Sequence, residues 1–338
     1  MKILITGGAG YIGAVTSRYL KDLGHTVHVY DHFVSHPESK LQSMADEPLA
    51  QGALTITRGG ILDKKTLEKV LSQFHPDVVM HFAAYIQMGE SVQNPRKYYD
   101  NNVIGSLSLI ESMIHVGCHR LVFASSAGVY GNLSPAKALA KEGNNTIPEN
   151  SCLEPTNPYG ETKLVVERLL KWYDKAYGFK SISIRFFNAA GAAGNLGEDH
   201  HDESHIIPNI LKAQGDDREF VLFGNDYSTP DGTCVRDYIH VLDLAEAFRL
   251  AAEMLVAGGN TTTYNAGTGV GYSNKQIVEM VEKVSGKPVK LSYAPRRPGD
   301  ADTLVADVSR IKAELGWSPT HSDLETIIKD AYAWHSKK

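Results

Sequence analysis

Short apolar runs alternate with amphipathic stretches along the first half of the chain. The apolar runs have the length and β-branched content of strands and fall at 2–6, 25–30, 53–57, 77–84, 120–126 and 181–188. Apolar positions that recur every three to four residues predict helices near 12–23, 64–74, 94–116 and 159–177. Strands that are apolar along most of their length are typical of a parallel sheet covered on both faces. The pattern therefore predicts an α/β fold with a doubly wound parallel sheet.

The alternation ends near Asn188. A polar, glycine-rich stretch follows at 189–205, and shorter mixed elements continue to the C-terminus. The segment "RDYIHVLDLAEAFRLAAEML" (236–255) is typical of a strand end and an amphipathic helix, which could return to the first domain. We expect a nucleotide-binding domain over 1–189, rejoined by about 236–268, and a smaller α/β lobe formed by 190–235 and 269–338.

The composition is that of an ordinary globular protein, and it argues against nucleic acid and membranes as partners. The 338 residues are 42% hydrophobic and 22% charged, with a net charge of -5. This balance gives no general attraction to nucleic acid or to acidic membranes. No stretch approaches the roughly 20 apolar residues that cross a bilayer. The opening "MKILITGGAG" has too short an apolar run for a signal peptide.

The cysteines point to a reducing compartment. Cys118, Cys152 and Cys234 show neither metal-ligand nor disulfide spacing, and their odd number favours free thiols. We therefore expect a cytoplasmic protein without a bound metal.

A glycine-rich turn follows the first predicted strand. In "TGGAGYIG", Gly7, Gly10 and Gly13 follow a G-x-x-G-x-x-G spacing between a strand and a helix. Glycine lets the backbone turn tightly and approach a pyrophosphate, whose charge then lies at a helix N-terminus. Asp31 follows the second strand, where it could bind a ribose 2'-OH and would repel a 2'-phosphate. These features favour NAD over NADP, with a ligand-free glycine turn as the simpler alternative.

Three further residues suggest acid-base chemistry. Ser126 ends the fifth strand, and the carboxyl edge of such a sheet is where ligands bind. In "NPYGETK", Pro158 suits the first turn of a helix, and Tyr159 and Lys163 fall one turn apart on one face. A tyrosine that acts as a base near pH 7 needs its pKa lowered by about three units, or about 4 kcal/mol. A lysine in solvent supplies only about 1 kcal/mol, so Tyr159 needs a drier cleft and further positive charge.

These features together resemble the extended short-chain dehydrogenase/reductase family, whose core is a Rossmann fold. The resemblance rests on the glycine turn, Ser126, the Tyr159/Lys163 pair and "RFFN". Longer strings resemble the UDP-galactose 4-epimerase branch of that family, and they run over essentially the whole chain: "GESVQNPRKYYDNNVIG", "NPYGETK", "FGNDYSTPDGTCVRDYIHVLDLA" and "APRRPGD".

The resemblance implies interconversion of UDP-glucose and UDP-galactose with no net redox change. Tyr159 would take the proton of the sugar 4-OH while NAD oxidises C4, and the resulting 4-keto sugar would turn and be reduced on its other face. The catalytic residues implied are Ser126, Tyr159 and Lys163. A UDP-hexose substrate and a homodimer are implied as partners.

The binding residues implied by the resemblance fall into two sets. For NAD they are Gly7, Gly10, Tyr11, Ile12, Gly13, Asp31, Ile61, Phe82, Ala83, Ala84, Asn102, Tyr159, Lys163 and Phe186. For the UDP-sugar they are Ser126, Tyr159, Asn188, His205, Ile206, Val221, Phe223, Arg236, Arg297, Asp300 and Leu304. Arginine forks suit the two phosphates, although Arg236 and Arg297 could equally be surface salt-bridge residues, and Phe223 could be core.

Four positions depart from the family pattern. Gly60 stands where many members have an aspartate that binds adenine, Ile86 where some have a lysine, and Phe186 where a tyrosine is common. We expect the loss of polar partners at Gly60 and Ile86 to weaken NAD retention. Leu304 has a size between the tyrosine of hexose-specific members and the small residue of those that accept N-acetylhexosamines. Side activity on N-acetyl sugars is therefore expected.

Several alternatives share this scaffold. A nucleotide-sugar 4,6-dehydratase would carry an Asp-Glu pair after Ser126, and a UDP-glucuronate decarboxylase usually has a glutamate there, whereas this chain has Ala127 and Gly128. A UDP-N-acetylhexosamine or bifunctional 4-epimerase and a UDP-pentose 4-epimerase would use the same machinery. A non-catalytic NAD-sensing protein would typically lack Tyr159 or Lys163.

Overall fold

The computed structural model describes residues 1–34, 41, 44, 53–133, 146–200, 203–297 and 300–337, and they form two compact units. The first unit comprises Met1–Val129, Pro155–Arg185 and Ala245–Tyr264. The second comprises Tyr130–Glu154, Phe186–Leu244 and Asn265–Lys338.

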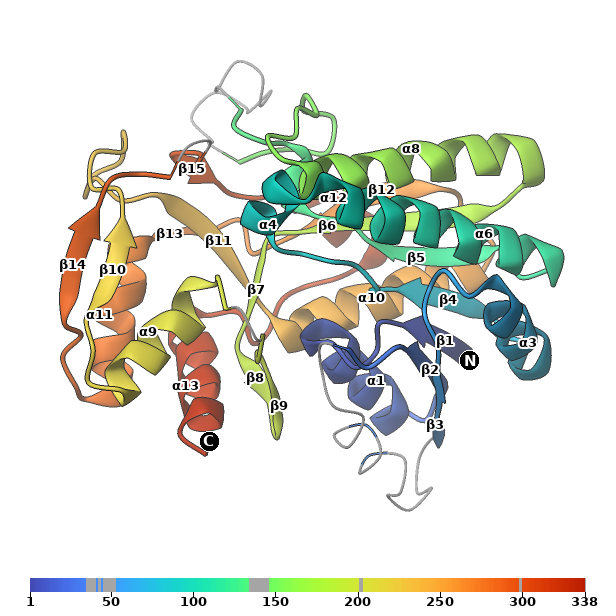
Figure 1. The fold of residues 1–338 in the computed structure, drawn as a ribbon, viewed down its shortest axis with the longest axis horizontal. Helices are drawn as coiled ribbons and strands as arrows, with labels where there is room; N and C mark the ends of the chain where they lie inside the picture. Colours follow the sequence, from blue (N-terminus) through green and yellow to red (C-terminus); the bar gives the residue numbers. More distant parts are fainter. Residues whose placement is uncertain are drawn as a thin grey trace. The chain divides into compact units, whose positions relative to one another are not determined.

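A seven-stranded sheet forms the centre of the first unit within the described residues (Figure 1). Its order is β3-β2-β1-β4-β5-β6-β12, and the neighbours from β3 to β6 pair in parallel. The strands are β1 (Lys2–Thr6), β2 (Thr26–Asp31), β3 (Ala53–Arg58), β4 (Val78–His81), β5 (Arg120–Ala124), β6 (Lys180–Phe186) and β12 (Thr262–Ala266). The chain changes direction across the sheet between β1 and β4, which is the switch point where doubly wound sheets bind ligands. The predicted fold class is confirmed.

Helices cover both faces of this sheet. Apolar side chains of α3, α6 and α8 pack on one face, where Leu67, Leu109 and Leu170 are buried against Leu4 and Phe123 of the strands. The helices of the first unit are α1 (Tyr11–Asp22), α3 (Lys64–Phe74), α4 (Met88–Gln93), α5 (Pro95–Tyr98), α6 (Gly105–His115), α8 (Pro158–Tyr177) and most of α10 (Val241–Val256), with a 3-10 turn η2 (Ala127–Val129). The α1 and α10 helices are joined by a hydrogen bond of 2.8 Å from the Tyr19 hydroxyl to Glu246.

The helix predicted near 94–116 is interrupted. Between α5 and α6 lies a π-helical turn, η1 (Tyr99–Ile104). Its buried Asn102 donates to the Tyr85 carbonyl at 3.0 Å and to the Thr162 hydroxyl at 3.2 Å, so tertiary contacts fix this turn. Such turns are frequent at functional sites, and the apolar periodicity carries no signal for them.

Helices and small sheets build the second unit. Its core lies among α9, α11 and α13, where Ile210, Ile277 and Ile327 are fully buried. The helices are α9 (Ile206–Gly215), α11 (Asn274–Ser285), α12 (Ser309–Leu315) and α13 (Leu324–His335). The strands are β7 (Asn188–Ala190), β8 (Ala192–Ala193), β9 (Leu196–Gly197), β10 (Phe220–Phe223), β11 (Val235–His240), β13 (Gly271–Ser273), β14 (Leu291–Ala294) and β15 (Thr303–Leu304).

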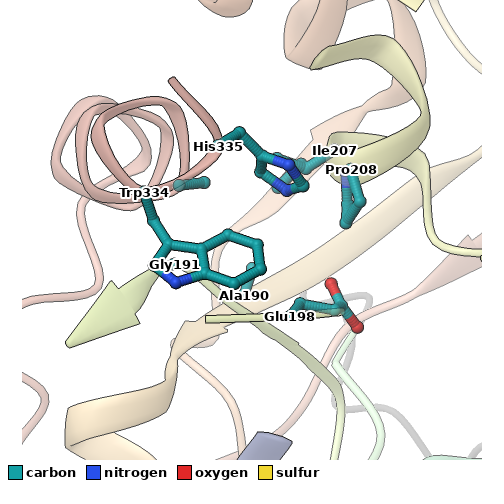
Figure 2. A pocket seen from close by; sticks show the side chains of 8 residues that line it. Ala190, Gly191, Glu198, Ile207, Pro208, Trp334 and His335 are labelled. Carbon is teal, nitrogen blue, oxygen red and sulfur yellow. The ribbon is translucent and has the colours of Figure 1, made fainter. Parts of the chain in front are cut away.

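Strand pairing in the second unit is both parallel and antiparallel. β11 pairs with β7 and β15 in parallel and with β13 in antiparallel fashion, and β10 pairs with β14 in parallel. A small pocket opens between β7, α9 and α13, and Figure 2 shows Glu198, Pro208, Trp334 and His335 among its lining residues.

The two units divide the chain differently from the expected domains at 130–154, 186–189, 236–244 and 265–268. Residues 130–133 and 146–154 pack with the second unit, because Asn265 accepts a hydrogen bond of 2.7 Å from the Tyr130 hydroxyl and donates one of 2.7 Å to the Ile147 carbonyl. Residues 236–244 also belong to the second unit, because β11 pairs with three of its strands. Among the described residues, no helix is long and apolar enough to cross a membrane.

Candidate active site

The glycine turn lies at the carboxyl end of β1 and packs tightly against the end of β4. Gly7 has a φ of +76°, and a Cβ there would lie 2.4 Å from the Ala83 nitrogen. A Cβ on Gly13 would lie 2.3 Å from the Gly7 carbonyl oxygen. Both positions therefore require glycine. Helix α1 begins after Gly10, and no side chain among the described residues caps it. Its first N–H groups are therefore available to an anion.

The segment after β4 forms the next wall of this turn. The backbone nitrogens of Phe82 and Ala83 both donate to the Thr6 carbonyl, at 2.9 and 3.1 Å. The Phe82 ring packs against Phe248 of α10, with centroids 4.5 Å apart. In the same unit, Tyr11 and Ile61 are buried, whereas Ile12 and Ala84 are partly exposed.

Asp31 is the last residue of β2 and reaches the glycine turn. Its carboxylate accepts hydrogen bonds from the backbone nitrogens of Ala9 at 3.0 Å and Phe33 at 2.8 Å. Burial opposes its ionisation, but hydrogen bonds from His32 and these two backbone groups hold the pKa of Asp31 below its ordinary value. A charged carboxylate with remaining lone pairs beside a glycine turn and an uncapped helix fits NAD.

Local sequence fixes the start of α8. The Asn157 side chain caps the helix by accepting from the Gly160 nitrogen at 3.0 Å, and Pro158 occupies the first turn. Gly178 ends the helix in a left-handed conformation. Tyr159 and Lys163 point into the protein and are only 7% and 4% exposed. The pair is therefore part of a buried helix face, and the reading of "NPYGETK" as a helix start is confirmed.

Ser126 follows β5 and lies beside this pair. Its hydroxyl accepts from the Gly128 nitrogen at 3.0 Å and is hydrogen-bonded with Tyr159. The Lys163 ammonium donates to the Ala124 carbonyl at 2.7 Å and lies 5.8 Å from the centre of the Tyr159 ring. The structure therefore brings the three predicted catalytic residues together at the carboxyl edge of the sheet.

Burial acts on the tyrosine and the lysine in opposite directions. It raises the pKa of Tyr159 above its ordinary value, and the hydrogen bond with Ser126 only partly opposes that rise. Burial lowers the pKa of Lys163 to about 7. A protonated Lys163 would stabilise a tyrosinate at Tyr159 through its charge. These residues alone do not make Tyr159 a base near neutral pH, and further positive charge is required.

A buried network behind these residues was not predicted from the sequence. The Ser125 hydroxyl donates to Glu167 at 2.6 Å, and Arg185 forms a bidentate pair with the same carboxylate at 2.9 and 2.6 Å. Glu167 and Arg185 are both 2% exposed. Glu167 lies one turn beyond Lys163 on α8, a spacing that could have suggested a shared buried face.

His81 at the end of β4 is a second residue that the sequence analysis missed. Its ring nitrogens contact the Thr6 and Ser106 hydroxyls at 2.7 and 2.8 Å. Burial and the nearby Lys163 lower the pKa of His81 to about 3, so the ring is neutral. His81 therefore connects β1, β4 and α6 beneath the glycine turn.

In the second unit, four of the residues predicted to bind substrate form one cluster. The Asp300 carboxylate lies 3.8 Å from the Arg236 guanidinium and 3.3 Å from that of Arg297. The Arg297 guanidinium lies 5.2 Å above the Phe223 ring, which is 41% exposed. The Tyr227 hydroxyl donates to Asp300 at 3.3 Å. This tyrosine lies within "FGNDYSTPDG" and was not predicted as a site residue.

The other predicted substrate residues occupy different places in the second unit. Asn188 lies on β7 and donates to the Asp237 carbonyl at 3.0 Å. Leu304 on β15 pairs with Arg236 of β11, and Val221 is exposed on β10. Ile206 begins α9.

His205 contacts two carboxylates. Its Nδ1 lies 2.9 Å from Glu198 and 2.9 Å from Glu203. Burial would lower the pKa of His205, but these carboxylates raise it well above its ordinary value. The sequence predicted His205 as a contact of the UDP-sugar and gave no sign of its ion pairs with Glu198 and Glu203.

Three of the residues that depart from the family pattern, Gly60, Ile86 and Phe186, lie in different surroundings. A Cβ on Gly60 would meet nothing within 4 Å, so neither space nor conformation requires glycine there. Ile86 is 37% exposed beyond β4. Phe186 is the last residue of β6.

The first unit thus combines a doubly wound sheet, a glycine turn at its switch point and a Ser-Tyr-Lys set at its carboxyl edge. This combination defines a dehydrogenase-type enzyme with a dinucleotide site.

Comparisons with known proteins identify the family. A family model described as GDP-mannose 4,6 dehydratase matches residues 4–331. The UDP-glucose 4-epimerase of Lactobacillus helveticus is 43% identical over 339 residues, covering 99% of this chain and 97% of that protein. The chain belongs to the extended short-chain dehydrogenase/reductase family and groups with its UDP-glucose 4-epimerases.

Solved structures agree with this assignment. The UDP-glucose 4-epimerase from Brucella ovis in complex with NAD is 38% identical with a TM-score of 0.89, covering 98% of this chain and 97% of that one. The enzyme from Bifidobacterium longum in complex with NAD+ and UDP is 33% identical with a TM-score of 0.88, covering 100% and 98%. The predicted family resemblance is confirmed.

Proposed function

We propose that this protein is an NAD-dependent 4-epimerase that interconverts UDP-glucose and UDP-galactose. The observation that carries the proposal is the buried Tyr159 and Lys163 pair, one helical turn apart, beside Ser126 in a chain whose relatives are UDP-glucose 4-epimerases. The 4,6-dehydratase chemistry in the name of the family model is disfavoured, because the buried Ala127 and the adjacent Gly128 offer neither acid nor base for eliminating water.

NAD would be held by the glycine turn, the N-terminus of α1, Asp31 and the segment after β4. When bound, it supplies a reversible two-electron oxidation of the sugar C4 alcohol. The polar Asn102 and the catalytic Lys163 would complete this site. Ile61 and Phe186 would contribute apolar contacts.

The protein's own residues move the proton. Tyr159 Oη would take the proton of the substrate 4-OH, and Ser126 would hold the same hydroxyl by a hydrogen bond. Lys163 would stabilise the tyrosinate through its charge. The 4-keto sugar would then rotate and present its other face for reduction. Tyr159 would return the proton to the C4 oxygen, which leaves C4 with the opposite configuration.

The second unit would bind the nucleotide. Arg236 and Arg297 carry guanidinium groups suited to the two phosphates, and Phe223 offers an exposed ring to the uracil. Asp300 would accept from the uridine ribose while it orients both arginines. Asn188, His205, Ile206, Val221 and Leu304 would complete the substrate contacts.

We further propose a cytoplasmic homodimer. Large apolar side chains are exposed on the neighbouring α4, η1 and α8 of the first unit and would be covered by a second copy: Met88, Val92, Tyr99, Ile104 and Trp172. Light scattering during size-exclusion chromatography would give twice the chain mass if this is correct.

Substrate choice tests the proposed function. Purified protein is incubated in turn with UDP-galactose, UDP-N-acetylgalactosamine and UDP-arabinose, with no NAD added, and the products are separated. UDP-galactose should be converted most efficiently, with slower conversion of the N-acetyl sugar because Leu304 is intermediate in size. If either other substrate is converted more efficiently, that substrate replaces UDP-galactose in the proposal. No turnover of any of the three, even after NAD is added, would favour an NAD-sensing protein.

A further inference from the structure

A cluster of histidines and carboxylates lies between β9 and α9 in the second unit. Glu198, His200 and His205 each bring one potential ligand atom within 4.8 Å of the others. Glu198 Oε1 lies 2.9 Å from His205 Nδ1 and 3.4 Å from His200 Nε2. Glu203 adjoins the set, with its Oε1 2.9 Å from the same His205 nitrogen.

The carboxylates of this cluster are buried. The side chains of Glu198 and Glu203 are 8% and 3% exposed. Glu203 Oε1 accepts from the backbone nitrogens of Ser204 and His205 at 2.9 and 2.8 Å. Its Oε2 is buried without a hydrogen-bond partner among the described residues. A buried carboxylate oxygen without a partner is unfavourable even beside His205, and a metal ion would relieve that cost.

The two separations from Glu198 to the histidine nitrogens are close to those between ligand atoms around a tetrahedral ion. Zinc binds imidazole nitrogen and carboxylate oxygen at about 2.0–2.1 Å, which separates neighbouring ligand atoms by about 3.3 Å. The observed separations of 2.9 and 3.4 Å lie on either side of this value. A divalent ion would also neutralise the two buried carboxylates together.

We propose that Glu198, His200 and His205 bind one divalent transition-metal ion, with zinc the best match to this donor set. Imidazole favours zinc and other late first-row metals over magnesium or calcium. Glu203 would orient or complete the site. Glu198 also lines the small pocket beside Ile207 and Pro208 (Figure 2).

The site would have a structural role. It would connect the chain after β9 to the first residues of α9, because His205 immediately precedes that helix. The site shares His205 with the proposed substrate contacts of the second unit and does not involve the catalytic residues of the first unit.

The test uses the full-length, tag-free protein after dialysis against a chelator. Zinc is titrated by calorimetry, and thermal unfolding is followed with and without zinc. We expect one site per chain and a higher midpoint of unfolding with zinc. Magnesium should have no such effect. His200→Ala and Glu198→Gln should each weaken zinc binding at least tenfold and abolish the shift.

His321→Ala is the matched control. In the same unit, His321 contacts the Asp243 carboxylate at 3.1 Å but lies outside the cluster. This variant should bind zinc like the wild type. If His200→Ala does not fold, as judged by circular dichroism, the milder His200→Asn replaces it. Wild-type binding no stronger than that of the His200 variant would overturn the proposal and leave a histidine-carboxylate network without an ion.

Discussion

The candidate functional residues of the two units differ in burial. In the first, Tyr159 and Lys163 are buried and fixed by hydrogen bonds to their own unit. In the second, the Arg297 side chain is 54% exposed and pairs with Asp300 within the cluster. Burial changes acid-base behaviour, whereas exposed cations remain accessible to a phosphate ligand. The first arrangement suits chemistry, and the second suits recognition of a charged nucleotide.

Removing the buried hydroxyl should produce the largest effect on activity. Tyr159→Phe keeps the packing but removes the group that moves the proton, so kcat should fall about a thousandfold or more. Tyr177→Phe is the control, because this tyrosine lies on the same helix and is 57% exposed. Initial rates of UDP-galactose conversion measure both. Activity of Tyr159→Phe within tenfold of the wild type would refute the catalytic role.

Breaking the buried ion pair should produce the largest effect on stability. Arg185→Met leaves the Glu167 carboxylate buried without its cation, and the free energy of unfolding should fall by about 3–5 kcal/mol. Arg18→Met removes a partly exposed pair with Asp22, measured at 2.9 Å, and should cost about 0.5 kcal/mol. Chemical denaturation of both variants measures the difference. Equal losses would show that burial does not distinguish the two pairs.

Lys163→Met should separate function from stability. Its ammonium is buried and its pKa is lowered to about 7, below the unfolded value of 10.5. The lysine therefore costs stability below pH 7, and this cost disappears as the pH rises from 7 towards 10.5. Methionine should raise the free energy of unfolding by about 1–2 kcal/mol at pH 6, despite leaving the Ala124 carbonyl without its donor.

The same variant should lose activity. Denaturation at pH 6 and pH 9 should show the stability gain shrinking at the higher pH. A gain that grows with pH would contradict the buried, weakly basic lysine.

A change in the cluster of Arg236, Arg297, Asp300 and Phe223 should affect substrate binding more than the chemical step. Arg297→Ala removes a phosphate donor, so KM for UDP-galactose should rise about tenfold, or about 1.4 kcal/mol, with kcat within a factor of two. Arg296→Ala is the neighbouring control, since that side chain binds Asp226 at 3.0 Å and lies 4.4 Å above the Tyr227 ring. An equal rise in KM for both variants would mean that the loss of one positive charge, and not a specific phosphate contact of Arg297, weakens binding.

The smallest effect is expected at the adenine end of the cofactor site. Gly60→Asp has room for its side chain and would supply the polar partner found in many relatives, so more NAD should stay with the purified protein. NAD released on denaturation, per mole of chain, should rise about threefold over the wild type. Gly89→Asp, also in open space, is the control. Full NAD occupancy of the wild type after long dialysis would contradict weak retention.

Local patterns predicted much of the fold and the first site. Strands and helices follow from the apolar periods, and Gly7, Gly13 and the Tyr159/Lys163 pair follow from turn and helix geometry. The Ser125–Glu167–Arg185 network was not predictable, because its hydrogen-bonded pairs are 18 and 42 residues apart and meet only through packing. The assignment of residues 130–133 and 146–154 to the second unit depends on distant hydrogen bonds in the same way.

The most direct test follows the hydrogen at C4. The purified protein is given UDP-galactose deuterated at C4 in ordinary water, with enough NAD added to saturate its cofactor site. If Tyr159 moves only the hydroxyl proton and the C4 hydrogen is removed and returned within one closed cycle, UDP-glucose will form with deuterium still at C4. Failure to form UDP-glucose, or UDP-glucose that has lost the deuterium, would contradict the proposed reaction.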